Sequence, residues 1–202
     1  MITLPLDTLK ALLQAAAKKD IRYYLVGILV DRRENDCTLV ATNGHMMLAV
    51  PHTSPEGETL ALPVGQYIIP RELVETVKAP LSGLVTVTID ATAQTVTIEG
   101  ASTVAGKLID GRFPDWRRVV PASANNEPAQ YDPVYLAAFH KAALLLGAPK
   151  RGAIPFVTFH NGNGAATITF PFHDARGVLM PMRHNSDGSL PAFEAVPAWA
   201  KH

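Results

Sequence analysis

The chain has 202 residues, of which 48% are hydrophobic and 18% charged. This composition is typical of a globular protein with a substantial core, and the length fits one or two domains. Eighteen basic residues balance eighteen acidic ones, so net charge alone does not predict a nucleic-acid partner, although local clusters still can. The single cysteine excludes a disulfide within the chain, which fits a reducing cytoplasm. No signal peptide and no apolar run of membrane-spanning length are present, so we expect a cytoplasmic protein that is not inserted in a membrane.

The first part of the chain predicts a helix followed by three strands. Leu9, Leu12, Leu13 and Ala16 follow helical spacing after Asp7, a plausible helix cap. Apolar or alternating runs separated by turn residues predict strands at residues 21–31, 37–43 and 46–51. On this interpretation the motif RYY at residues 22–24 opens a strand, and the cysteine at position 37 is a buried side chain rather than a nucleophile.

The same order of elements recurs twice. Residues 71–79 read as a second helix, and residues 84–90, 94–99 and 103–109 as strands. Asp132 and Pro133 open a third helix that runs to residue 146 and is closed by Gly147. The predicted strands that follow it lie at residues 155–160, 165–170 and 177–183. Helix starts near residues 7, 70 and 132 therefore predict an α+β fold of three helix-and-strand units, each of about sixty residues. Residues 184–202 read as an irregular tail.

A joint between two folded parts is predicted at residues 107–121, with the sequence KLIDGRFPDWRRVVP. It begins with strand-like alternation, breaks at Asp110 and Gly111, and ends in a run of basic and apolar residues. Linkers are usually polar, so a joint that holds Phe113 and Trp116 should pack against both of its neighbours. The alternative is a last strand followed by a buried connector.

No motif in the chain predicts catalysis, a metal site or a cofactor. The segment GASTVAGK at residues 100–107 has its glycines one residue too far apart for a phosphate-binding loop, and Leu108 stands where Ser or Thr would reach magnesium. The seven histidines show no metal-ligand spacing. His45 lies at a turn between two predicted strands, where a structural role is the more common one. Basic and aromatic residues occur together at Lys18–Tyr24, which fits either phosphate contacts or ordinary strand aromatics beside a solvated helix end.

Four motifs together resemble the bacterial DNA polymerase III beta subunit, the beta sliding clamp. They are RYYLVGILV at residues 22–30, LVATNGH at 39–45, the joint at 107–121 and VLMPMR at 178–183. They occur in the family's order and at roughly its spacing. Residues 1–121 resemble the family's central domain, and residues 122–183 resemble its last domain with one helix-and-strand unit missing.

The resemblance implies a DNA clamp fold in which helices lie on one face of the sheets and line a hole for duplex DNA. A family ring contains twelve units, so three units per chain imply four copies. A ring holds DNA topologically and needs only a mildly basic lining. Residues on or beside the inner helices, or in the family's DNA-touching loop, are implied as DNA contacts: Lys10, Lys18, Lys19, Arg22, Tyr23, Tyr24, Arg71, Lys78 and Lys141.

The resemblance also implies a pocket for short linear peptides of polymerase, clamp loader and repair proteins, between the second and third of the family's domains. Matched residue by residue, its walls are Leu25, Thr42, Gly44, His45, Met47, Pro114, Arg118, Val119, Val178, Met180, Pro181, Met182 and Arg183. Two positions depart from the family, since Asn43 replaces an aspartate and Met46 an arginine.

Two functions of different classes follow. The first is a non-catalytic processivity factor that forms a homo-oligomer around DNA and tethers a polymerase. The alternative is a peptide-binding mimic or regulator that competes for clamp partners without encircling DNA. An enzyme is the weakest interpretation, because no constellation of residues supports one.

Overall fold

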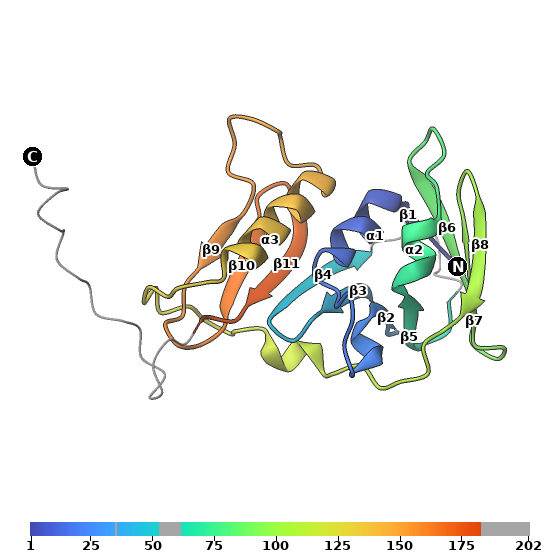
Figure 1. The fold of residues 1–202 in the computed structure, drawn as a ribbon, viewed down its shortest axis with the longest axis horizontal. Coiled ribbons are helices and arrows are strands. Elements are labelled where there is room, and N and C mark those ends of the chain that lie inside the picture. Colours follow the sequence, from blue (N-terminus) through green and yellow to red (C-terminus); the bar gives the residue numbers. More distant parts are fainter. Residues whose placement is uncertain (35, 53–61, 183–202) are drawn as a thin grey trace, which may run out of the picture.

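The computed structural model describes residues 1–34, 36–52 and 62–182, and within them the chain forms three repeated α+β units (Figure 1). Unit 1 consists of β1 (Ile2–Pro5), α1 (Leu6–Leu13), β2 (Gly27–Arg32), β3 (Cys37–Thr42) and β4 (Met46–His52). Unit 2 consists of β5 (Gly65–Pro70), α2 (Arg71–Thr76), β6 (Leu84–Asp90), β7 (Thr95–Glu99) and β8 (Thr103–Lys107). Unit 3 consists of α3 (Pro133–Leu145), β9 (Val157–Phe159), β10 (Ala166–Phe170) and β11 (His173–Leu179). The predicted threefold repeat is confirmed.

Units 1 and 2 exchange their first strands. Strand β1 precedes α1 but pairs with β6, and β5 precedes α2 but pairs with β2, both antiparallel. The smaller sheet therefore has the order β1-β6-β7-β8. This exchange ties the two units into one body with a shared core, and neither β1 nor β5 was predicted from the sequence.

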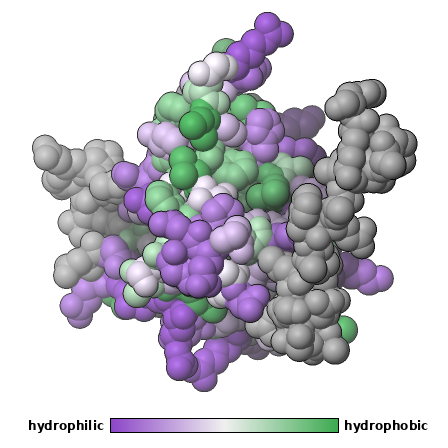
Figure 2. Space-filling view, turned by 90° about the vertical axis from the view of Figure 1, so that its left-hand side faces the viewer, coloured by the Kyte–Doolittle hydropathy of each residue, from purple (hydrophilic) through white to green (hydrophobic). Residues whose placement is uncertain are grey.

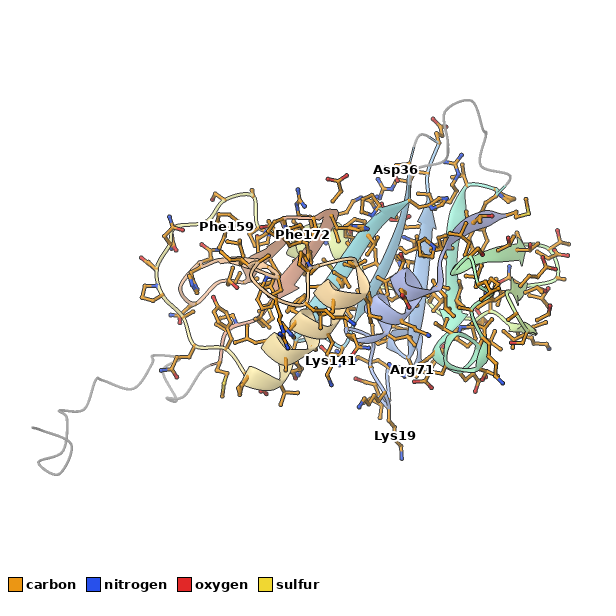
Figure 3. All side chains as sticks on the ribbon, turned by 90° about the horizontal axis from the view of Figure 1, so that it is seen from above. Lys19, Asp36, Arg71, Lys141, Phe159 and Phe172 are labelled. Atoms are coloured by element: carbon orange, nitrogen blue, oxygen red, sulfur yellow. The ribbon has the colours of Figure 1, made fainter. Side chains whose placement is uncertain are left out.

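Unit 3 continues the larger sheet, which has the order β5-β2-β3-β4-β11-β10-β9. Strands β4 and β11 pair antiparallel at the seam between units 1 and 3, from Met46 opposite Leu179 to Ala49 opposite Arg176. The helices α1 and α3 lie along one side of this sheet (Figures 1 and 3). In unit 3, Phe139 of α3 is fully buried between Phe156 and Phe170, at ring-centroid distances of 6.1 and 6.3 Å.

The joint between units 2 and 3 crosses the other side of the large sheet. It contains one short 3-10 turn, Trp116–Val119. Phe113 is buried in a second apolar cluster with residues of β2, β3, β4, β5 and β11, including Val40 and Val178. The cluster explains why every residue of β2 is buried although α1 covers only one face of the sheet. The prediction that the joint packs against both neighbours is confirmed.

Several predicted boundaries were wrong. Residues 23–25 form a 3-10 turn rather than the start of a strand, and β2 begins only at Gly27. Helix α2 ends at Thr76, before the predicted residue 79. Strand β11 runs from His173 to Leu179, so residues 180–182 follow the strand instead of forming its end. The start of α3 agrees with prediction: the Asp132 carboxylate accepts a hydrogen bond from the Val134 amide at 2.8 Å.

Candidate functional site

A pocket of about 230 Å³ lies at the seam, where the β3–β4 turn, the joint and the end of β11 meet. Its lining is mainly apolar, and it is open on one side to solvent. The lining residues are Arg22, Leu25, Thr42, Gly44, His45, Met46, Met47, Pro114, Asp115, Trp116, Val119, Val178 and Met180. Segments far apart in the sequence therefore share one surface, as the predicted cleft requires.

The β3–β4 turn forms one wall of the pocket and is fixed by its own side chains. The Asn43 side-chain oxygen accepts hydrogen bonds from the amides of His45 and Met46, both at 2.9 Å. The Thr42 hydroxyl donates to the Met46 carbonyl at 2.7 Å and accepts from the Gly44 amide at 3.0 Å. Gly44 has a φ of +91°, a left-handed conformation that glycine adopts without strain. The hydrogen bonds within the sequence TNGH therefore determine the shape of this wall.

Three further contacts connect the turn to neighbouring elements. The carbonyl of His45 accepts a hydrogen bond from the Met180 amide at 2.9 Å, which extends the seam beyond β11. The His45 ring stacks on Tyr135 of α3, with centroids 5.8 Å apart. The Arg22 guanidinium donates to Asp20 and holds the pKa of that carboxyl at about 2. Arg22 is therefore oriented by a partner that is ionised at neutral pH, while one of its terminal nitrogens reaches the carbonyl of Asn43 at 3.4 Å.

The joint supplies the opposite wall, and a buried carboxylate fixes its position. Asp31 of β2 is 3% exposed and accepts hydrogen bonds from the Trp116 indole nitrogen, at 2.9 Å, and from the Arg117 guanidinium. Burial alone would raise the pKa of Asp31, but these hydrogen bonds outweigh it and place the pKa below its ordinary value. Arg117 also lies over the Trp116 ring, 4.1 Å from its centroid. Asp31 does not line the pocket, yet it positions Trp116, which does.

The structure brings most of the predicted pocket residues together. Those that line it are Leu25, Thr42, Gly44, His45, Met47, Pro114, Val119, Val178 and Met180, whereas Arg118, Pro181 and Met182 do not. Arg183 lies outside the described residues. Sequence reasoning did not place Met46, Asp115 and Trp116 in the pocket, and it assigned Arg22 only to DNA. Trp116 belongs to the joint, whose unusual aromatic content was noted in the sequence. That content was the signal that could have placed Trp116 in the pocket. A role of these residues in peptide binding stays a prediction.

A larger hollow of about 710 Å³ lies between α1 and α3 on the helix side of the sheet. Four basic side chains line it: Lys18, Lys19, Arg22 and Lys141. Figure 3 shows Lys19 and Lys141 projecting on this side, away from Asp36. Arg22, His45 and Met46 line both the hollow and the seam pocket, so one short wall separates the two. The arrangement offers a basic surface suited to phosphates.

The remaining predicted DNA contacts are spread out. The Arg71 guanidinium donates to the carbonyls of Leu13 and Ala16 at the end of α1 and pairs with Glu75 at 2.7 Å, so much of its capacity is engaged within the chain. Tyr23 is 56% exposed and lines a third hollow with Lys18 and Arg71. Other positions lie outside these hollows: Lys10, Tyr24 and Lys78. DNA binding by this set stays a prediction.

Within the described part of the chain, no group of three or more His, Cys, Asp or Glu side chains is placed to hold a metal ion. Burial raises the pKa of the Cys37 thiol to about 11, so this cysteine is a weak nucleophile at neutral pH. None of the helices described is both long enough and apolar enough to cross a membrane.

Comparison with known proteins gives one family. Residues 3–115, more than half of the chain, match the family model described as DNA polymerase III beta subunit, central domain. The chain is 31% identical over 162 residues to the beta sliding clamp of Escherichia coli K12, an alignment that covers 77% of this chain and 43% of that protein. It is 31% identical over 175 residues to the beta sliding clamp of Proteus mirabilis, with 83% and 45% of the two chains covered. The chain therefore spans less than half the length of these curated relatives.

Solved structures show the same fold. The DNA polymerase III subunit beta from Borrelia burgdorferi, in complex with a natural product, aligns with a TM-score of 0.64 and 14% identity over 91% of this chain and 64% of that one. A sliding clamp from Bartonella birtlesii bound to griselimycin aligns with a TM-score of 0.60 and 21% identity over 91% and 66%. The repeated units, the seam and the matched residues 3–115 agree with one another, and the chain belongs to the DNA polymerase III beta subunit family.

Proposed function

We propose that this chain is a sliding-clamp subunit, a non-catalytic accessory protein of a DNA polymerase. Copies of it assemble around duplex DNA in the cytoplasm, and the seam pocket binds short linear peptides of a polymerase and a clamp loader. The observation that carries the proposal is the seam pocket itself, because it joins the family's central domain to unit 3 in one apolar site. The division into domains at residues 121 and 183 is part of the same proposal.

The pocket suits a short peptide with apolar anchor side chains. Met46, Met47 and Met180 contribute flexible, polarisable walls that adapt to different anchors. Arg22 lines the pocket, and although two of its nitrogens bind Asp20, its remaining N–H groups can donate to a peptide carboxylate. A pocket of this size accepts one or two side chains, which is the usual scale of a peptide hot spot.

The helix side of the sheet suits the DNA. Lys18, Lys19 and Lys141 gather in the hollow between α1 and α3, while the chain as a whole is neutral. A neutral protein with a locally basic face binds phosphates weakly and without sequence preference. Such weak contacts permit movement along DNA, provided that the assembly itself prevents escape.

A matched pair of methionines tests the pocket. Met180 is 40% exposed and lines the pocket, whereas Met182 is 38% exposed and does not. We expect Met180→Ala to weaken binding of a fluorescent peptide, carrying the clamp-binding tail of a bacterial polymerase, by roughly 5- to 30-fold in an anisotropy titration, because an anchor contact is lost. Met182→Ala should stay within about twofold of the parent. Equal affinities for parent and Met180→Ala would show that the peptide site lies elsewhere.

A further inference from the structure

The outer edge of β9 has no strand beside it within the described residues, although the equivalent edges in units 1 and 2 are both paired. In each unit the first strand after the helix lies at one end of the three strands that follow one another in the chain. These strands are β2, β6 and β9. Strand β2 is covered by β5 and strand β6 by β1, but the large sheet ends at β9. Unit 3 is therefore the one described unit whose sheet lacks a donated strand.

The exchange in units 1 and 2 is reciprocal in detail. The amide of Leu6, the first residue of α1, donates to the carbonyl of Gly83, just before β6, at 2.9 Å. The amide of Arg71, the first residue of α2, donates to the carbonyl of Val26, just before β2, at 3.2 Å. The contact that unit 1 makes with unit 2 is therefore equivalent to the contact that unit 2 makes with unit 1. Two bodies related by a twofold axis show this relationship.

Unit 3 has a segment before its helix that could be donated, but no described unit of the chain lies beside it to exchange strands. The residue before α3, Asp132, has an extended backbone with φ −61° and ψ 121°, close to the values of Pro5 and Pro70 at the same position in the other units. The segment of residues 127–131 leads into it, as β1 and β5 lead into their helices. In the single chain this segment lies against its own unit, beside the end of β9. The Asn126 amide donates to the carbonyl of His160 at 3.1 Å, the Gly162 amide to Glu127 at 2.9 Å and the Met182 amide to Gln130 at 2.8 Å. The exchange replaces these contacts with contacts to the other copy.

The surface beside this edge is apolar. Ile154 is 65% exposed and Phe159, on β9 itself, is 42% exposed. Figure 2, which faces this end of the molecule, shows a hydrophobic area surrounded by hydrophilic residues. Natural proteins usually protect an open strand edge with charges, and Val157–Phe159 carries none. An unpaired edge next to exposed apolar side chains is typical of an interface.

We infer that two copies of this chain associate about a twofold axis at β9, each placing its segment of residues 127–131 along the β9 of the other. The occupant of the edge is thus a second copy, and the contact continues the sheet that already joins units 1 and 3. The two third units then form a complete two-unit body, equivalent to units 1 and 2 within one chain. The inference rests on the proposed function only in giving this dimer a role, as a step in the assembly of copies. Its geometry is argued from the pairing of the strands.

The test begins with the full 202-residue chain, without DNA or peptide, measured by sedimentation equilibrium over a range of concentrations. We expect reversible association, and Phe159→Lys should raise the dissociation constant at least tenfold because it places a buried charge at the interface. Phe172→Lys is the matched control: Phe172 is 45% exposed but lies in the β10–β11 turn (Figure 3), and its variant should associate like the parent. A parent chain that remains monomeric, or equal effects of both substitutions, would overturn the inference.

Disulfide trapping identifies the edge directly. The variants Ala129→Cys and Thr158→Cys are mixed under mild oxidation, so that any bond between the two positions must join two chains. Strands that pair bring such positions within disulfide distance, and the buried Cys37 remains unreactive. We expect a covalent dimer from this mixture and none when Ala101→Cys, in the β7–β8 turn, replaces Ala129→Cys. Equal yields from both mixtures would contradict exchange at β9.

The outcomes separate this inference from the proposed function. A chain that dimerises at β9 but does not bind the polymerase peptide supports the inference and refutes the function. A monomer that binds the peptide refutes the inference and retains the peptide site. If the chain dimerises only after residues 183–202 are removed, the inference fails for the full chain.

Discussion

At the scale of single residues, Asp31 controls the joint although it lies outside the pocket. Its carboxylate accepts hydrogen bonds from Trp116 and Arg117, so its removal leaves the Trp116 indole nitrogen without this acceptor and Arg117 with only the exposed Asp36 nearby. We expect Asp31→Ala to lower the free energy of unfolding by about 1–3 kcal/mol and to weaken peptide binding, as measured by urea denaturation and anisotropy. Asp36→Ala removes an exposed carboxylate 3.5 Å from the same Arg117 and should cost less than about 1 kcal/mol. Equal losses would mean that Asp31 has no special role.

The same carboxylate predicts how the joint responds to acid. The pKa of Asp31 is lower in the folded chain than in an unfolded one, so its stabilising contribution is present above the unfolded value of about 4 and is lost as pH falls through the folded value. Trp116 reports this change, once the other tryptophan is replaced by Trp199→Phe. We expect its fluorescence to stay constant from pH 7 to about pH 4 and to change below that. A transition near pH 6 would point to a histidine instead.

At the scale of elements, the β3–β4 turn depends on Gly44. A Cβ at this position would lie 3.0 Å from the Arg22 guanidinium, and the φ of +91° would be strained for any other residue. Gly83 has a φ of +73° but open space around it. We expect Gly44→Ala and Gly83→Ala each to cost about 1 kcal/mol in thermal or urea unfolding, because both adopt a left-handed backbone.

The two glycine variants differ in their effect on function. Gly44→Ala displaces Arg22 from the rim of the pocket and should weaken peptide binding several-fold, whereas Gly83→Ala should leave it unchanged. The measurement is the same anisotropy titration at a temperature where both variants are folded. Unchanged affinity for Gly44→Ala would remove Arg22 from the peptide site.

The sequence was informative wherever local chemistry decides the structure. Asp132 and Pro133 predicted the start of α3, and the TNGH turn predicted the end of β3, because caps and turns depend on neighbouring residues. The aromatic content of the joint predicted its burial, and the pocket at the seam followed from the family resemblance.

What sequence reasoning missed depends on partners far away in the chain. Strands β1 and β5 are short and gain their stability from the unit that they join, so their own pattern was weak. The 3-10 turn at Tyr23–Leu25 interrupts a run that looks like a strand. Asp31 holds the joint through Trp116 and Arg117, which follow it by 85 and 86 positions in the sequence. No local spacing reveals such a contact.

At the scale of the whole molecule, the proposed ring depends on the strand edges that the described units leave open. Strand β8 holds in unit 2 the place that β4 holds in unit 1, and β4 pairs antiparallel with β11, the last strand of another unit. We expect the open edge of β8 to make a similar contact between dimers. We propose that contacts at β9 and at β8 alternate around the assembly. The helix side, with Lys19 and Lys141, would face the DNA (Figure 3).

The most direct test of the clamp proposal is retention of the full chain on nicked circular DNA, compared with the same DNA cut once by a restriction enzyme. A ring that encircles DNA leaves only through an end, so we expect co-elution with the circle on gel filtration and loss from the linear form. The variant Phe159→Lys, whose association at β9 should be weakened at least tenfold, is expected to be lost from both. Equal release of the parent chain from circular and linear DNA would contradict the account.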